Sequence, residues 1–202
     1  MVWKAAINIV MRNSLAWLPI ASGALVLVLS LGLALLTVTT GGRGQNSGGG
    51  QNTTAKAQEA VPTISLTPRE GSYDFSAGQS YPVGIVVDSG GKSIDGVDVE
   101  ISFDPTRVQV TGGKVNPTTL FSEVPLNSVD NVKGMIKFSA LTFEPKAVAG
   151  VVGTFSFVPK IKGEVNFAFV FVPGATTDSN MAEHGSAVDV LGKVESATYS
   201  FK

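Results

Sequence analysis

Hydrophobic and polar residues alternate along most of the chain after residue 61, and this two-residue period is typical of half-buried β-strands. The clearest case is the segment 97–103, in which every second residue is Val, Ile or Phe and the residues between them are Asp, Glu and Ser. One face of this strand is therefore expected to pack inward while the other face meets water. The Asp-Pro pair at 104–105 is expected to end the strand.

The same reasoning predicts strands throughout the rest of this region. They are expected at residues 63–67, 81–87, 108–110, 135–143, 151–158, 165–171 and 194–201. A turn at 88–91 is expected to end the second of these strands, and the glycine pair at 112–113 is expected to end the third. Since nothing after residue 61 follows a 3.6-residue period, the sequence predicts an all-β domain, either a sandwich or a barrel, with at least eight strands.

Seven of the eleven phenylalanines are predicted to lie on the inward faces of these strands, where they would form the core. They are Phe103, Phe138, Phe155, Phe157, Phe167, Phe169 and Phe171. An aromatic ligand cleft is the alternative role for these side chains.

The N-terminal segment has a different pattern, because residues 13–42 form a run of thirty without one charged residue. A bilayer core of about 30 Å requires roughly 20 apolar helical residues, so we predict a transmembrane helix at 13–40. Basic residues precede the run, which favours a short cytoplasmic N-terminus at 1–12, single-pass insertion in the cell membrane and an extracellular β domain. A cleaved signal peptide is the alternative, although the run is long for one and lacks an Ala-x-Ala site.

Residues 41–60 are predicted to be a flexible linker rich in Gly, Asn and Ser. This segment has six glycines in its first ten positions and no large apolar residue, so it cannot bury enough surface to offset the entropy of ordering. A coil of twenty residues has a mean span of about 25 Å, which would hold a domain clear of the lipid headgroups.

Charge and composition exclude several classes of function. Fifteen Lys and Arg against sixteen Asp and Glu give a formal net charge of −1, so the chain has no overall field that would attract nucleic acid. The chain has no cysteine, which removes disulfides, thiolate nucleophiles and cysteine zinc sites.

Candidate catalytic and metal-binding residues are few. His184 is the only histidine, and its surroundings predict a solvated loop rather than a Ser-His-Asp site. The acidic residues that could form a glycosidase pair are expected on turns and on one solvent-facing strand, and they are Asp88, Asp95, Asp98 and Glu100. Three scattered residues could offer oxygen ligands to calcium, or could instead stabilise turns, and they are Asp178, Asn180 and Asp189. We therefore predict no enzyme activity, no metal and no cofactor.

Several short segments, in order and with suitable spacing, resemble a cohesin domain over residues 62–202. The segments are LTP at 66–68, GQSYPV at 78–83, VDVEISFDP at 97–105, VVGTFSF at 151–157, TDSN at 177–180 and VDVL at 188–191. The resemblance implies a jelly-roll β-sandwich of about nine strands, in the same structural superfamily as cellulose-binding modules.

The resemblance also implies a function. Cohesins bind dockerin modules, which carry the calcium, and so assemble polysaccharide-degrading enzymes on bacterial surfaces. The dockerin contacts outward polar residues of the strand before Asp-Pro, often with an Asn-x-Asp pattern. Here Asp98 matches the second position and Gly96 replaces the first, so the expected partner-binding residues are Asp98, Glu100 and Gly96.

Two other functions remain open at this point. The first is direct polysaccharide binding, for which the β region has no tryptophan and only three tyrosines, at 73, 81 and 199. The second is an adhesin or structural surface subunit that pairs through an open sheet edge.

Overall fold

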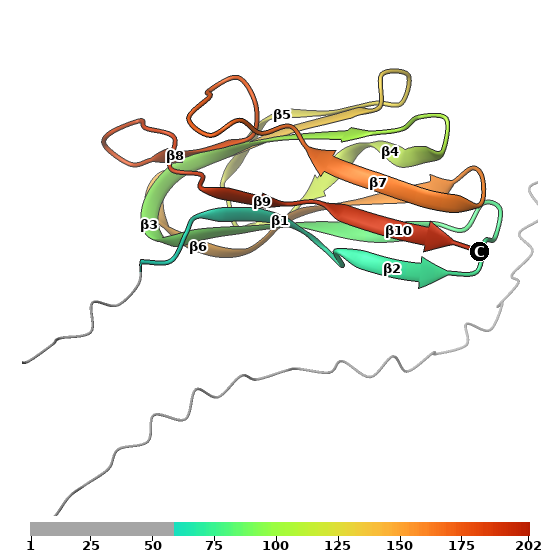
Figure 1. The fold of residues 1–202 in the computed structure, drawn as a ribbon. Helices are drawn as coiled ribbons and strands as arrows, with labels where there is room; N and C mark the ends of the chain where they lie inside the picture. The colour runs from blue at the N-terminus through green and yellow to red at the C-terminus, as the bar shows by residue number, and fades with distance from the viewer. Residues whose placement is uncertain (1–58) are drawn as a thin grey trace, which may run out of the picture. The chain divides into compact units, whose positions relative to one another are not determined.

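The computed structural model describes residues 59–202, in which all ten regular elements are β-strands (Figure 1). They are β1 Thr63–Thr67, β2 Glu70–Tyr73, β3 Tyr81–Phe103, β4 Val108–Pro117, β5 Glu123–Asp130, β6 Met135–Pro159, β7 Gly163–Phe169, β8 Asn180–Glu183, β9 Lys193–Glu195 and β10 Ala197–Phe201. The all-β prediction is confirmed, with ten strands in place of about nine.

The strands form two layers that share the long strands β3 and β6. In the first layer β9, β1, the first half of β3, the second half of β6 and β4 lie in that order. The second layer begins with β5, the first half of β6 and the second half of β3. The other edge of β3 pairs with β8 along one stretch and with β7 along another. Strand β7 then pairs with β10, and β10 pairs with β2. Because β3 and β6 bend together from one layer into the other, all ten strands are connected by hydrogen bonds (Figure 1).

The expected turn at 88–91 does not end a strand, and this prediction is wrong. The chain bends here instead: Gly90 and Gly91 have φ angles of 62° and 85°, and pairing with β6 is interrupted between Asp88 and Ser93. The Ser89 hydroxyl is buried in the bend, where it donates to the carbonyl of Lys92 and accepts from the Val148 amide. The bend of β3 is thereby attached to the bend of β6.

Two further boundaries also differ from prediction because irregular strands continue past their glycines. Strand β4 runs through Gly112 and Gly113, which have φ angles of 77° and 67° and shift its register against β6. The predicted strands 135–143 and 151–158 are the two halves of β6. Glycines in a strand therefore mark bulges and bends here rather than ends.

Aromatic side chains from the two layers meet in the core. The ring centroid of Phe167 on β7 lies 5.2 Å from that of Phe155 and 4.9 Å from that of Phe157, both on β6. Tyr199 on β10 lies 5.2 Å from Phe157. All four rings are at most 1% exposed, and each such burial is worth roughly 1.5–3 kcal/mol.

Five of the seven phenylalanines predicted to be inward are buried, and they are Phe103, Phe138, Phe155, Phe157 and Phe167. The other two, Phe169 and Phe171, are only half-buried, because β7 ends at Phe169. All buried apolar residues in the described part lie between Pro62 and Phe201, and residues 59–202 lie within one compact unit. This part of the chain therefore contains a complete core and can fold as a separate fragment.

The predicted cytoplasmic segment 1–12, the transmembrane helix 13–40 and nearly all of the linker 41–60 lie outside the described residues. Within residues 59–202 no helix is long and apolar enough to cross a bilayer.

Candidate partner-binding face

The three residues predicted to bind a partner lie along the second half of β3. Asp98 and Glu100 are half-buried and alternate with the buried Val97, Val99 and Ile101. The strand therefore has the predicted two-sided pattern, with its apolar residues in the core and its acidic residues on the outside of the second layer.

Strand register places other side chains beside these residues. Across an antiparallel pair, directly opposed residues share a face. Asp98 is opposite Ser139 of β6, which is opposite Leu126 of β5, and Glu100 is opposite Lys137, which is opposite Ser128. We call this surface the outer face, and it comprises Gly96, Asp98, Glu100, Leu126, Ser128, Lys137, Ser139, Leu141, Asn180 and Ala182.

The polar groups of the outer face are linked across strands. The ammonium group of Lys137 forms an ion pair with Oε1 of Glu100. Nδ2 of Asn180 on β8 donates to Oδ2 of Asp98 at 3.3 Å and to the carbonyl of Asp178 at 3.1 Å. These contacts hold the acidic side chains in defined positions before any partner binds.

Gly96 lies where β3 comes close to β6. A Cβ atom at this position would lie 2.7 Å from the carbonyl oxygen of Ala140 and 3.2 Å from Cβ of Leu141. The residue also borders a bulge, because pairing with both β6 and β8 shifts register between Ile94 and Gly96. The glycine at the first position of the Asp98 pattern thus has a packing reason, and the residue is buried rather than open to a partner.

The segment before β8 forms one side of the outer face, and the sequence did not identify it as part of a docking surface. The Ser179 hydroxyl is buried, accepts from the Glu100 amide at 3.0 Å and donates to the Glu100 carbonyl at 3.2 Å. Asp178 is 7% exposed, and its Oδ2 accepts from the Val172 amide at 2.6 Å. Ser179 therefore attaches this polar loop to β3, and Asp178 holds the backbone of the loop itself.

A small hollow lies on the outer face between β3, β5 and the segment before β8. Its volume is about 210 Å³. It is lined by Asp98, Val99, Glu100, Leu126, Lys137, Phe138, Ser139, Thr176, Thr177 and Asp178. Leu126 is 43% exposed, so the hollow has an apolar wall opposite its acidic side.

The outer face ends in a more apolar region near the bend of β6. Phe143 is 78% exposed and is the only exposed aromatic residue among residues 59–202. It shares a second hollow with Pro145 and His184. Nδ1 of His184 lies 2.7 Å from Oδ1 of Asp95, and both side chains are well exposed. The predicted solvated position of His184 is confirmed.

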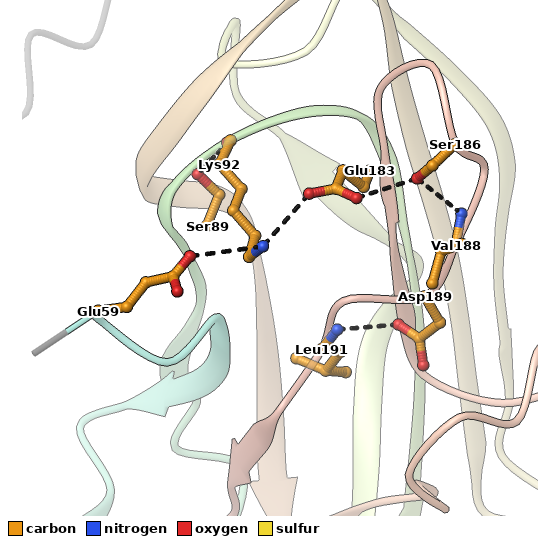
Figure 2. Close-up of polar contacts among 8 residues, drawn as sticks. All are labelled: Glu59, Ser89, Lys92, Glu183, Ser186, Val188, Asp189 and Leu191. Carbon is orange, nitrogen blue, oxygen red and sulfur yellow. Dashed lines mark hydrogen bonds and ion pairs between the residues drawn. The ribbon is translucent and has the colours of Figure 1, made fainter.

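Lys92 connects this end of the domain to the start of the described chain. Figure 2 shows its ammonium group between two carboxylates, 3.3 Å from Oε1 of Glu183 and 3.6 Å from Oε1 of Glu59. The hydrogen bond with Glu183 raises the pKa of Lys92. The pKa of Glu183 is lowered, first by a hydrogen bond from the Ser186 hydroxyl and then by Lys92.

The acidic residues considered as a glycosidase pair have separate partners. Asp88 accepts from the Gly90 amide at 2.9 Å, and Asp95 contacts His184. Asp98 contacts Asn180, and Glu100 contacts Lys137, as described above. Asp98 and Glu100 line the same small hollow, whereas Asp88 stabilises the bend and Asp95 contacts a loop.

The three candidate calcium ligands also contact the protein itself. Oδ1 of Asp189 accepts from the amides of Met181 and Leu191, the second of these being an Asx turn (Figure 2). Asp178 and Asn180 make the contacts given above. In the described residues, no group of three or more His, Asp or Glu side chains is arranged to hold a metal ion.

Several cohesins of known structure have a fold similar to that of this chain. A type II cohesin from the cellulosome of Acetivibrio cellulolyticus superposes with a TM-score of 0.55 at 15% identity, covering 69% of this chain and 95% of that one. A type I cohesin–dockerin complex from Clostridium thermocellum gives 0.54 at 11% identity, covering 73% and 97%. A non-cellulosomal cohesin from the archaeon Archaeoglobus fulgidus gives 0.52 at 10% identity, covering 71% and 92%.

Residues 59–202 have a cohesin-like fold. The expectation from the sequence resemblance is confirmed at the level of the fold. No family model matches the chain. No curated protein matches it either. At identities of 10–15%, the similarity shows the fold of this domain and does not identify what the domain binds.

Proposed function

We propose that the cohesin-like domain is a non-enzymatic docking module that binds a dockerin-like protein through its outer face. The observation that carries the proposal is the outer face itself, on which Asp98, Glu100 and Lys137 are held by cross-strand contacts beside the exposed Leu126. A rigid polar surface with an apolar anchor point is suited to protein recognition. The type I cohesin structure from C. thermocellum, which is a complex with a dockerin, supports this choice of partner.

We further propose that the chain presents this domain outside the cell. The support comes from the sequence, in which the uncharged run at 13–42 precedes a glycine-rich linker. In this arrangement residues 13–40 anchor the chain in the cell membrane as a single pass, and the docked partner is kept at the surface, where it takes part in polysaccharide binding or degradation.

Binding is tested with the fragment 54–202 and the dockerin-like modules encoded by the source organism, which are identified by duplicated calcium loops. Titration calorimetry is expected to give a one-to-one complex. Failure of every such module to bind the folded fragment would contradict the proposed partner.

The absence of cysteine allows a direct test of membrane topology. A single cysteine introduced by Ser47→Cys is expected to react with a membrane-impermeant maleimide on intact cells. A cysteine introduced by Ala5→Cys is expected to react only after lysis. The reverse result would place the domain inside the cell.

Direct glycan binding is the second candidate function, and one observation favours it. Phe143 is largely exposed beside the hydrogen-bonding pair of His184 and Asp95, so that a sugar ring stacked on it could also reach polar groups. A single ring is a small platform for stacking, which is why docking is preferred. If the domain binds soluble polysaccharides and Phe143→Ala abolishes this binding, glycan binding would be preferred over protein docking.

A further inference from the structure

We propose that the small hollow on the outer face receives an arginine guanidinium group from the partner protein. This inference rests on the proposed docking function and specifies the chemistry of the partner at one point of contact. Three carboxylates line the hollow, those of Asp98, Glu100 and Asp178, together with the ammonium group of Lys137. Three negative charges and one positive charge leave a net charge of −2 there.

Asp178 supplies the observation that points to a ligand. The residue is 7% exposed, and only one of its carboxylate oxygens is paired, through the Val172 amide. The other oxygen, Oδ1, is buried and has no hydrogen-bond partner among residues 59–202. A buried carboxylate oxygen without a donor is costly, so a donor or cation supplied by a ligand would be bound favourably.

Lys137 carries the positive charge in the hollow, but it does not neutralise Asp178. Lys137 forms its ion pair with Glu100 on the neighbouring strand. Asp98 receives a single hydrogen bond, from the neutral amide of Asn180 at 3.3 Å. Two of the three carboxylates therefore have no cationic partner in the described part of the chain.

The shape of the hollow favours a single side chain over a small molecule. Its volume of about 210 Å³ is below the roughly 300–1,000 Å³ typical of sites that bind whole ligands. The exposed Leu126 forms an apolar wall on one side, against which the methylene stem of a long cationic side chain can pack.

Arginine fits this site better than lysine or a metal ion. Its planar guanidinium carries five donors in a fork that can contact two carboxylates at once, whereas an ammonium group acts as a point charge. Asn180 Nδ2 links the Asp98 carboxylate to the backbone carbonyl of Asp178. The Val172 amide holds the Asp178 carboxylate through Oδ2, so both acceptors are positioned in advance. The acidic side chains of the described residues are not arranged to hold a metal ion.

The test uses two monocations of matched length, n-propylguanidinium and n-butylammonium, titrated into the labelled fragment 54–202 and followed by NMR. Saturable shifts of the side-chain carboxyl signals of Asp98 and Asp178 are expected with propylguanidinium. We expect its affinity to fall by about tenfold or more in Asp178→Asn, which keeps the size of the side chain. Asp98→Asn is expected to weaken it as well, and Glu70→Gln on the distant strand β2 is the matched control.

The outcomes separate this inference from the proposed function. Absence of a saturable shift, an unchanged affinity in both Asp98→Asn and Asp178→Asn, or equal binding of butylammonium would overturn the arginine site. If a dockerin-like module binds equally well to wild type and to a folded Asp178→Asn domain, the arginine site fails and the docking function stands. If propylguanidinium binds as expected while no such module does, the site stands and the docking function fails.

Discussion

The ammonium nitrogen of Lys92 lies 3.3 Å from Oε1 of Glu183, and this contact joins the bend of β3 to the end of the short strand β8 (Figure 2). Strand β8 pairs with β3 over only four positions, so its far end depends on side-chain contacts. Ser186 donates to the other oxygen of Glu183 and thereby attaches the following loop to the same carboxylate. The Glu183 carboxylate therefore connects the bend of β3, the end of β8 and the loop that follows it.

Removing the charge of Glu183 is expected to destabilise the domain at neutral pH and not in acid. The folded pKa of Glu183 is lowered from its usual 4.5, so its stabilising contribution is present above pH 4.5 and is lost as pH falls through the folded value. Urea midpoints of wild type and Glu183→Gln should therefore differ at pH 7 and converge near pH 2. Glu144→Gln, at an exposed position on β6, is the control and should match wild type at both pH values.

Restoring the asparagine of the family pattern by Gly96→Asn is expected to destabilise the domain. The new Cβ would lie 2.7 Å from the Ala140 carbonyl oxygen, and overpacking of this kind costs about 1–3 kcal/mol. The control is Gly91→Asn at the bend, where the added Cβ meets open space and asparagine tolerates the positive φ, so that the cost should stay below about 1 kcal/mol. Equal urea midpoints for the two variants would show that the close approach at Gly96 relaxes without cost.

Much of this architecture could be predicted from the sequence, because burial leaves a periodic signal. The alternation at Val97–Phe103 predicts four apolar residues in the core and Asp98 and Glu100 outside, as the structure has them. Strands β2, β5 and β8 were not predicted. They are edge strands or short strands with polar residues on both faces, so they bury too little apolar surface to produce a period.

The candidate site was less predictable, because it depends on contacts distant in sequence. Ser179 bonds the backbone of Glu100 across 79 positions, and Asn180 reaches Asp98 across 82. A polar loop sequence predicts turns, but it does not say which strand the loop packs against. The sequence predicts a turn at 88–91 for a similar reason, because glycines with positive φ occur both in turns and in bends within a strand.

The buried hydroxyl of Tyr199 is expected to make the domain sensitive to alkali. The side chain is 1% exposed, and its hydroxyl donates to the Pro68 carbonyl at 2.6 Å. Burial raises the pKa of Tyr199 above its usual 10, so the folded state keeps the proton that the unfolded chain releases. Stability should therefore fall above pH 10, by up to about 1.4 kcal/mol for each pH unit until the folded value is reached.

The comparison for this prediction is Tyr199→Phe. At pH 7 the variant should lose about 1 kcal/mol, because the Pro68 carbonyl loses its donor. Between pH 10 and 11.5 its free energy of unfolding should decline less steeply than that of wild type. Parallel declines in urea unfolding experiments would mean that Tyr199 ionises as readily in the folded protein as in the unfolded chain.

Removal of calcium is expected to abolish docking without affecting the cohesin-like domain. The family resemblance assigns the calcium to the dockerin, and residues 59–202 hold no side-chain cluster suited to a metal. Excess EDTA should therefore leave the thermal unfolding of the fragment 54–202 unchanged while eliminating its binding to a dockerin-like module. A lowered melting temperature of the isolated fragment in EDTA would show a metal site in the domain itself.

Truncating Asp98 and Glu100 is expected to weaken partner binding to different extents. Asp98 has one weak neutral donor, so a partner can use its full charge, and Asp98→Ala should reduce affinity by about tenfold or more. Glu100 is already neutralised by Lys137, so Glu100→Ala should cost less, about twofold to fivefold. Calorimetry with one dockerin-like module measures both, with Glu70→Ala on β2 as the control. A larger loss for Glu100 than for Asp98 would mean that the partner displaces Lys137 and binds Glu100 directly.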